Sequence, residues 1–324
     1  MVGGSNMNWH GSRSSWELGD KLINASKFHL RTLWLFNAND LTSIVLPSTF
    51  FALFGGLACA LDDSHTFAVH SHLPPLGHIL LSVPQVLWWA WINLLSFSIN
   101  NQRSPQAVAE DALNKPWRPI PSRRLSSKSA AQLLPASHLS AIITSIALGN
   151  LTQCLGLIIL GYMYNNRGGG DTSWLSRNVI NAGGFTCFSS GALQVVLASY
   201  GSAMKIFGWW SFVIAAIIFT TVHTQDMYDQ EGDATRNRRT VPLVIGDGPA
   251  RISIAFAMAV WCWLSSWLWR STWIGYVGPV SLGLTVMLRT LLYRSVVADK
   301  NTFRIWNLWL VSIYLLPVLR SVGV

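Results

Sequence analysis

The sequence predicts an all-α, polytopic membrane protein. Hydrophobic residues make up 51% of the 324-residue chain and charged residues only 11%, whereas ordinary globular chains carry about 25% charged residues. Apolar stretches recur along the chain at nearly the length that crosses a bilayer, roughly 20 residues. Many of the 17 tryptophans stand near the ends of these stretches, where an interfacial belt of aromatic residues is expected.

Nine apolar stretches are candidate transmembrane helices. Several contain Pro, Asn, Gln or His, and eight spans is the next best count. The nine stretches cover residues 43–60, 76–97, 130–149, 151–164, 178–198, 207–223, 252–269, 273–293 and 305–319. Residues 41–324 are therefore expected to form one transmembrane domain.

Residues 1–40 form a separate segment that mixes aromatic and basic residues. Trp16 and Trp34 occur together with Lys21, Lys27 and Arg31. This composition predicts an amphipathic helix at the membrane interface. For residues 1–12, a partly disordered tail is an equally good interpretation.

A dense acidic motif follows the sixth predicted span. Four of the chain's 14 acidic residues lie between Asp226 and Asp233. Asp226, Asp229 and Asp233 are three and then four residues apart, so on a helix they share one face. Three carboxylates at the end of a membrane segment repel one another and need counter-ions. Mg²⁺ would supply them, since it binds one or two carboxylates and leaves other positions to water and phosphate. The alternative is a solvated acidic cap on a membrane helix.

Basic residues follow the acidic motif at once. Arg236, Arg238 and Arg239 come within six residues of Asp233. Arginine binds phosphate oxygens in a bidentate manner, so these side chains could hold the oxygens that a metal ion does not. The whole stretch therefore predicts a site for a metal ion and a diphosphate.

A second stretch, after the second predicted span, repeats this order. Polar and acidic residues are followed by a basic turn that contains proline, and four predicted spans separate the two copies. The chain thus looks like an internal duplication, two four-helix repeats plus one further helix, and the duplication places both acidic helix ends at the same membrane face. The residues that matter in this stretch are Asn101, Glu110, Asp111, Lys115, Arg118 and Arg123.

A glycine-rich loop, residues 168–170, lies between the two motifs on the same predicted face. Glycines of this kind mark a turn. Arg167, just before them, could join the phosphate-binding residues, and an ordinary loop arginine is an equally good interpretation.

The two motifs together resemble those of the UbiA superfamily of intramembrane prenyltransferases. The pattern Asp226-x-x-Asp229-x-x-Gly232-Asp233 is similar to the second motif of that family, and residues 114–119 (Asn-Lys-Pro-Trp-Arg-Pro) are similar to the basic turn after its first. The first motif departs from the family pattern, which has Asn followed by Asp four and eight residues later. Its Asn-Gln … Glu-Asp form is similar to a fungal branch that includes terpene cyclases. The resemblance covers about residues 40–320.

The resemblance implies a helical catalytic domain with a cavity open to an isoprenoid diphosphate. The implied catalytic residues are Asp111, Asp226, Asp229 and Asp233. Mg²⁺ would be held by Asp226, Asp229 and Asp233, with Asn101, Glu110 or Asp111 opposite. The diphosphate would be neutralised by Lys115, Arg118, Arg123, Arg236 and Arg239, with Arg167 as a further candidate.

Three activities are compatible with such a site. The first is class I cyclisation of farnesyl diphosphate to a sesquiterpene hydrocarbon, with the allylic cation held between aromatic side chains. The second is transfer of a prenyl chain to an aromatic or polyketide acceptor, and the third is transport without catalysis. Acidic residues are absent from the middle of the predicted spans. Because a transferase often needs a base to activate its acceptor, this absence favours the cyclase.

The distribution of basic residues predicts the orientation in the membrane. With nine spans and a cytosolic N-terminus, 19 of the 23 Lys and Arg residues fall on the cytosolic side, as the positive-inside rule requires. The net charge of +9 is therefore a sign of orientation rather than of nucleic-acid binding. We expect a multi-pass protein of the endoplasmic reticulum membrane, in contact with the lipid bilayer, with both motifs facing the cytosol.

Overall fold

The computed structural model describes residues 10–61, 74–197 and 204–324. Within these ranges the chain forms helices and connecting turns without any strand, so the prediction of an all-α fold is confirmed. Residues 1–9 of the predicted tail and residue 198 at the end of the fifth predicted span lie outside the described residues.

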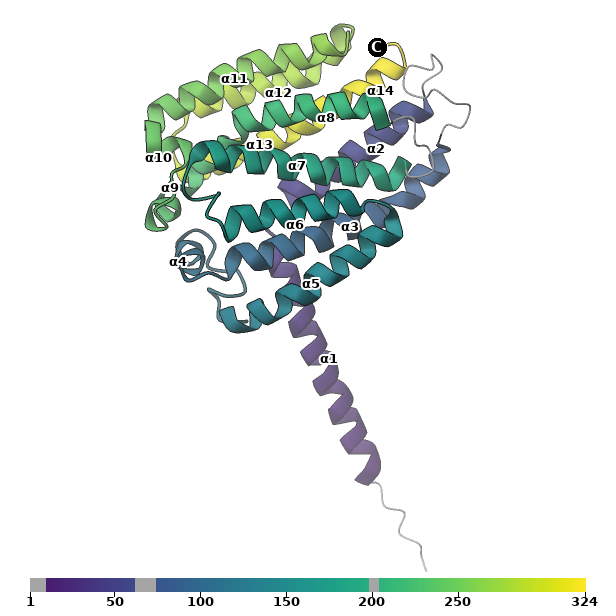
Figure 1. Ribbon diagram of the computed structural model, residues 1–324, viewed down its shortest axis with the longest axis vertical. Coiled ribbons are helices and arrows are strands. Elements are labelled where there is room, and N and C mark those ends of the chain that lie inside the picture. The colour runs from purple at the N-terminus through teal and green to yellow at the C-terminus, as the bar shows by residue number, and fades with distance from the viewer. Residues whose placement is uncertain (1–9, 62–73, 198–203) are drawn as a thin grey trace, which may run out of the picture.

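The helices follow one another in the order shown in Figure 1. They are α1 (His10–Asn37), η1 (Leu41–Val45), α2 (Leu46–Ala60), α3 (Leu76–Gln102), α4 (Pro105–Asn114), α5 (Ser127–Leu148), α6 (Leu151–Asn165), α7 (Trp174–Leu197), α8 (Met204–Thr221), η2 (Val222–Thr224), α9 (Asp226–Thr235), α10 (Val241–Ile245), α11 (Asp247–Leu268), α12 (Trp273–Leu292), α13 (Val296–Tyr314) and α14 (Leu316–Ser321).

Eight helical segments of the described chain are long and apolar enough to cross a membrane. The fourth predicted span, residues 151–164, forms α6, which has only 15 residues and is shorter than the roughly 20 that span a bilayer. The predicted count of nine spans is therefore not established. Gly149 ends α5 in the left-handed conformation with φ 75°, which glycine adopts without steric cost, and α6 begins two residues later.

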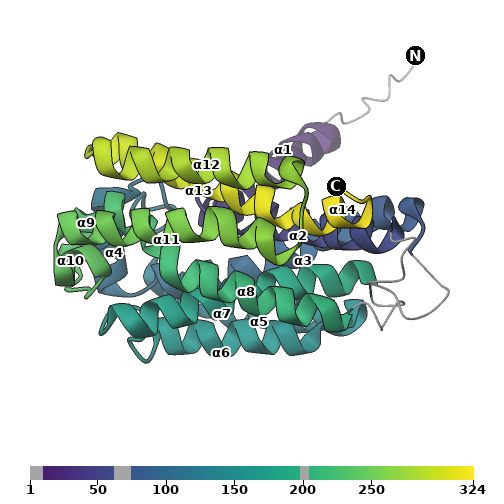
Figure 2. The same ribbon diagram turned by 90° about the horizontal axis from the view of Figure 1, so that it is seen from above.

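The order of long and short helices repeats along the chain. Two long helices are followed by a short polar one and two further helices, first in α2–α6 and again in α7–α12, and α13 completes the bundle. The short helices α4, α9 and α10 lie together at one end of the bundle in both Figure 1 and Figure 2. The predicted duplication therefore places both polar helices at the same face.

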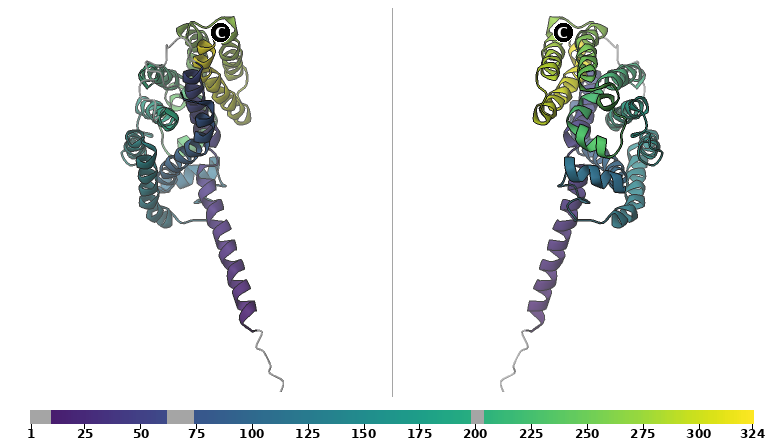
Figure 3. Two further views of the ribbon diagram at one scale, coloured as in Figure 1. Left: turned by 90° about the vertical axis from the view of Figure 1, so that its right-hand side faces the viewer. Right: turned by 90° about the vertical axis from the view of Figure 1, so that its left-hand side faces the viewer.

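The N-terminal helix α1 extends away from the bundle, as Figure 3 shows from both sides. Several of its apolar side chains are exposed, among them Leu22, Leu30 and Trp34. The prediction of an interfacial helix followed by a separate domain stays a prediction.

Four tryptophans of the predicted spans are fully buried instead of forming an interfacial belt. Trp89 of α3 donates a hydrogen bond to Ser145 of α5, 2.8 Å away, and its ring fills the space where Gly191 of α7 has no side chain. Small residues of this kind let membrane helices approach closely. The four are Trp89, Trp210, Trp306 and Trp309.

Candidate active site

The two sequence motifs meet where α4 packs against α9. Lys115, directly after α4, forms an ion pair with Asp229 of α9 at 3.0 Å from Nζ to Oδ2. The Asn114 amide donates to the backbone oxygen of Asp229 at 3.3 Å. The structure therefore joins two segments that lie 114 residues apart in the sequence.

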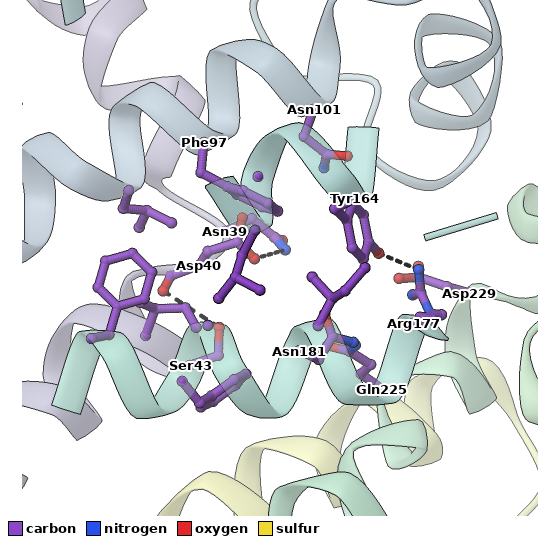
Figure 4. Close-up of a pocket in the computed structure, with 18 of the residues that line it drawn as sticks. Asn39, Asp40, Ser43, Phe97, Asn101, Tyr164, Arg177, Asn181, Gln225 and Asp229 are labelled. Carbon is purple, nitrogen blue, oxygen red and sulfur yellow. Dashed lines mark hydrogen bonds between the residues drawn. The ribbon is translucent and has the colours of Figure 1, made fainter. Parts of the chain in front are cut away.

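A cavity of about 150 Å³ opens beside this junction. The end of the cavity beside α4 and α9, which we call its mouth, is lined by the charged side chains of Glu110, Lys115, Arg118, Asp229 and Arg238. Figure 4 shows Asn101 and Tyr164 on one side of the space and Asn181 on another. The aromatic residues that line the cavity are Phe97, Tyr164, Phe185, Phe188 and Tyr228. One end of the cavity is thus charged, and its interior is apolar and aromatic.

Each carboxylate predicted for the site pairs with a basic side chain. Arg177 of α7 donates from Nη2 to Asp226 at 2.8 Å and also contacts the Tyr164 hydroxyl. The other ion pairs are Asp229–Lys115 at 3.0 Å, Asp233–Arg238 at 2.9 Å, Asp111–Arg118 at 2.8 Å, and Glu110 with Arg236 at 3.1 Å and Arg238 at 2.7 Å. Most of these groups are buried, and a buried charge requires such a partner.

Several side-chain oxygen atoms of the site have no hydrogen-bond partner and could bind a divalent cation. Asp226 and Asp233 each keep a buried Oδ2 atom without a hydrogen-bond partner, and Asn101 keeps its Oδ1. Oxygen atoms of this kind are the ligands that Mg²⁺ prefers. Within the described part of the chain, no three acidic, His or Cys residues converge into a metal centre by themselves. Water and phosphate oxygens would have to complete the coordination, as Mg²⁺ commonly requires.

Burial and neighbouring arginines shift the carboxyl pKa values in different directions. Burial raises the pKa of Asp233 to about 6, with help from the charge of Asp226 and against Arg177 and Arg238. Burial also raises the pKa of Asp111 above its ordinary value, more than the nearby cations lower it. For Glu110, burial is outweighed by the neighbouring cations, Arg238 foremost, and its pKa lies below the ordinary value. Glu110 is therefore held firmly in its ionised form.

Four of the predicted phosphate-binding residues do not line the cavity. One of them, Arg236, is buried and pairs with Glu110 and Asp171, and the other three are exposed. These three are Arg123, Arg167 and Arg239, which form no ion pair with any described residue. Arg123 occupies a turn at φ 60°. The backbone N–H of Arg239 donates to the backbone oxygen of Asp171 at 2.8 Å. The side chains of these three arginines therefore extend into solvent and not into the cavity.

Three other charged residues, Arg177, Asp40 and Asp171, contribute to the site although sequence reasoning did not assign them to it. Arg177 lines the cavity, as does Asp40 just before the first span. Asp171 contacts Arg236 and Arg238 from the loop after α6. A signal did exist for Arg177, because a charged residue at the start of an apolar helix is costly and usually functional.

With this geometry established, comparison with known proteins identifies the family. The model of the UbiA prenyltransferase family matches residues 67–310.

This chain belongs to the UbiA prenyltransferase family.

Its similar relatives include two synthases and a transferase. The chain is 27% identical over 248 residues to the fumagillin beta-trans-bergamotene synthase of Aspergillus fumigatus, covering 75% of this chain and 77% of that one. It is 27% identical over 283 residues to the somaliensene A/B synthase of Streptomyces somaliensis, covering 85% and 88%. It is also 26% identical over 262 residues to a polyprenyl transferase of Hericium erinaceus, covering 76% and 79%.

Solved structures of UbiA proteins share the fold. A digeranylgeranylglyceryl phosphate synthase superimposes with a TM-score of 0.55 at 14% sequence identity, covering 89% of this chain and 98% of that one. A UbiA homolog from Archaeoglobus fulgidus bound to GPP and Mg²⁺ superimposes with a TM-score of 0.52 at 15% identity, covering 86% and 98%. These likenesses establish the helical architecture of this chain as that of UbiA proteins.

Proposed function

We propose that this UbiA protein is a Mg²⁺-dependent class I terpene cyclase that ionises farnesyl diphosphate and converts it to a cyclic sesquiterpene hydrocarbon. The observation that supports this most is the division of the cavity into a charged mouth and an apolar, aromatic interior. Such a cavity suits a substrate with a diphosphate at one end and a hydrocarbon chain at the other. Two synthases among the relatives, at 27% identity, support the same reaction class.

The residues at the mouth would act on the leaving group. Lys115, Arg118 and Arg238 line the cavity there and would neutralise the diphosphate as its C–O bond breaks, which is stabilisation aimed at developing charge. Asp226 and Asp233 do not line the cavity themselves but pair with Arg177 and Arg238, which do. They would hold Mg²⁺, whose charge adds to that stabilisation when it is bound. The UbiA homolog solved with GPP and Mg²⁺ supports this assignment.

The interior would control the allylic cation that remains. The bonding electrons leave with the diphosphate, and an alkene of the same chain then attacks the cation to close a ring. Phe97, Phe185 and Phe188 would stabilise the positive charge, each by about 2 kcal/mol when water is excluded. Loss of a proton to a diphosphate oxygen would restore a double bond, so that the products are a C15 hydrocarbon and inorganic diphosphate.

Transfer of the prenyl chain to an aromatic or polyketide acceptor is the alternative, and one observation favours it. Asp40 lines the cavity with 31% of its side chain exposed. Its ion pair with Arg118 is long, at 3.4 Å. A carboxylate in that position could take a proton from an acceptor hydroxyl. The similarity to a polyprenyl transferase points the same way.

The two activities differ in their need for an acceptor. Membranes that contain the protein would be incubated with C10, C15 and C20 prenyl diphosphates and Mg²⁺, and the hydrocarbon products analysed by mass spectrometry. The cyclase predicts a cyclic C15 hydrocarbon without any acceptor. If the C15 substrate stays intact or yields only farnesol, while an added phenol is prenylated, the transferase takes its place.

We also propose that residues 41–324 are the catalytic domain, placed in the endoplasmic reticulum membrane with the cavity mouth toward the cytosol. The excess of Lys and Arg on the side of α4 and α9 supports this orientation.

A further inference from the structure

Four charged side chains form a closed ring at the cavity mouth, and two of them, Glu110 and Arg238, line the cavity. The ring consists of Glu110 of α4, Asp171 of the loop after α6, and Arg236 and Arg238 after α9. Glu110 accepts from Arg238 at Oε1, 2.7 Å away, and from Arg236 at Oε2, 3.1 Å away. Asp171 accepts from Arg238 at Oδ1, 2.9 Å away, and from Arg236 at Oδ2, 3.2 Å away. Each carboxylate thus gives one oxygen to each arginine.

The two arginines of this charged ring differ in which guanidinium nitrogens are already hydrogen-bonded. Arg236 uses Nε, Nη1 and Nη2 within the ring and does not line the cavity. Arg238 uses Nε and Nη1, the latter also toward Asp233 at 2.9 Å. Its Nη2 donates to no described residue, and Arg238 lines the cavity. The charged ring therefore fixes one side of the Arg238 guanidinium and leaves the other side available.

Glu110 and Asp226 differ in whether a carboxylate oxygen remains without a hydrogen-bond partner. Both oxygens of Glu110 are occupied by arginines. Asp226 and Asp233, by contrast, each keep one buried oxygen without a partner. A carboxylate whose oxygens are both hydrogen-bonded to cations has little capacity left for a metal ion, whereas a buried unpartnered oxygen has that capacity.

We propose that Glu110 and Asp171 are positioning residues that hold Arg238 at the cavity mouth with Nη2 directed to the diphosphate of the substrate. This inference rests on the proposed function only in requiring a diphosphate as the ligand. Glu110 then serves as an anchor for two arginines, and not as the Mg²⁺ ligand that the sequence predicts. Asp171 joins the loop after α6 to both motifs.

The physical basis is the conformational entropy that a long side chain loses when it binds a ligand. An arginine loses several freely rotating bonds when it binds an anion, and a side chain already held by hydrogen bonds loses fewer. Removing the Asp171 charge releases Arg238 at Nε and leaves it held by Nη1 alone. The expected loss of diphosphate affinity is about tenfold, the size of one charge-assisted hydrogen bond.

The test uses full-length protein in detergent and inorganic diphosphate with Mg²⁺ as the probe. Isothermal titration would compare wild type, Asp171→Asn, Asp171→Glu and Glu110→Gln. We expect Asp171→Asn to weaken binding of the magnesium diphosphate about tenfold and Glu110→Gln by at least as much. Asp171→Glu should restore much of the affinity because it restores the charge. Binding of Mg²⁺ alone should stay unchanged in all three, and should weaken in Asp226→Asn.

Asp247→Asn is the matched control. Asp247 is also a partly exposed aspartate, and it shares its partner Arg251 with a second acid, Asp299. Its loss should leave diphosphate affinity unchanged. A second control places Asp171→Asn in an Arg238→Ala background, where its effect should shrink to about twofold or less, since Asp171 acts through Arg238.

Several results would overturn the inference. Unchanged diphosphate affinity in Asp171→Asn would do so, as would a full tenfold effect in the Arg238→Ala background. Weaker Mg²⁺ binding in Glu110→Gln would return Glu110 to the metal site. A variant that fails to fold is replaced by Asp171→Glu, for which loss of affinity in folded protein counts against the proposal. Wild type that binds magnesium diphosphate but makes no C15 hydrocarbon would contradict the cyclase alone and leave this inference standing.

Discussion

The side chain of Asn114 lies directly over Gly232, so close that a Cβ atom on Gly232 would overlap the Asn114 amide. This contact joins the C-terminal end of α4 to α9. Because the helices can approach only where a side chain is missing, glycine at position 232 sets the distance between the two motifs. The Lys115–Asp229 ion pair lies beside the same contact.

Replacement of Gly232 should therefore separate the motifs. We expect Gly232→Ala to lower the free energy of unfolding by about 1–3 kcal/mol, the usual cost of overpacking, and to reduce diphosphate release. Thermal unfolding in detergent would measure the first effect. Gly208→Ala is the control, since nothing lies within 4 Å of a Cβ atom there. Equal stability of the two variants would show that α4 and α9 can move apart freely.

The acidic motif should be needed for ionisation and not for folding. Asp226→Asn is expected to lower the rate of diphosphate release by about 10²-fold or more, because it weakens the hold on Mg²⁺, whose charge would stabilise the leaving group. EDTA should have the same effect on wild type. Asp299→Asn is the control, since Asp299 is a buried aspartate that pairs with Arg251 at 2.8 Å; it should lose stability but keep its activity per folded molecule. Full activity of wild type in EDTA would remove Mg²⁺ from the reaction.

The pKa of Asp233 predicts a pH-dependent stability in the absence of metal. Burial raises this pKa from 3.8 to about 6, so the fold favours the protonated form. The resulting stabilisation is present below about pH 4 and is lost as the pH rises through 6. In EDTA at pH 8, Asp233→Asn should thus melt at or above the temperature of wild type, and the difference should shrink as the pH falls below 6 and close near pH 4. A clearly lower melting temperature at pH 8 would mean that the ionised Asp233–Arg238 pair is net stabilising.

The interior of the cavity should determine the product. Phe188→Leu removes an aromatic ring that lines the cavity, and we expect it to change the ratio of hydrocarbon products with little change in substrate affinity. Phe51→Leu is the control because Phe51 is buried but does not line the cavity. Both variants should lose about 1–2 kcal/mol of stability. An identical product mixture from Phe188→Leu would show that the cation does not approach this ring.

Orientation in the membrane can be tested by cysteine labelling. Arg123 and Arg239 are exposed at the end that contains α4 and α9, and Thr272 is exposed between α11 and α12 at the other end. Cysteines at positions 123 and 239 should react from the cytosol and one at position 272 from the opposite side. Labelling of positions 123 and 239 from different sides would rule out a single site built from both motifs.

The sequence by itself determined the helical class, most span boundaries and the two motifs. These features depend on local properties: a run of apolar residues of bilayer length, and carboxylates spaced three and four apart at a helix end. The duplicated order of the motifs was enough to place α4 and α9 at one membrane face. The fourth predicted span differs, because it forms α6, which has only 15 residues and is shorter than a full span.

Only the tertiary structure decided which charges pair. Arg177 reaches Asp226 from 49 residues away, and Asp171 reaches Arg236 and Arg238 from 65 and 67 residues away. Residue type and spacing made every arginine near the motifs an equal candidate for the phosphate. The packing of α4, α7 and α9 buries some of these arginines against carboxylates and leaves Arg123, Arg167 and Arg239 in solvent. The energy of a charge depends on its burial and on its neighbours, and neither is a property of the local sequence.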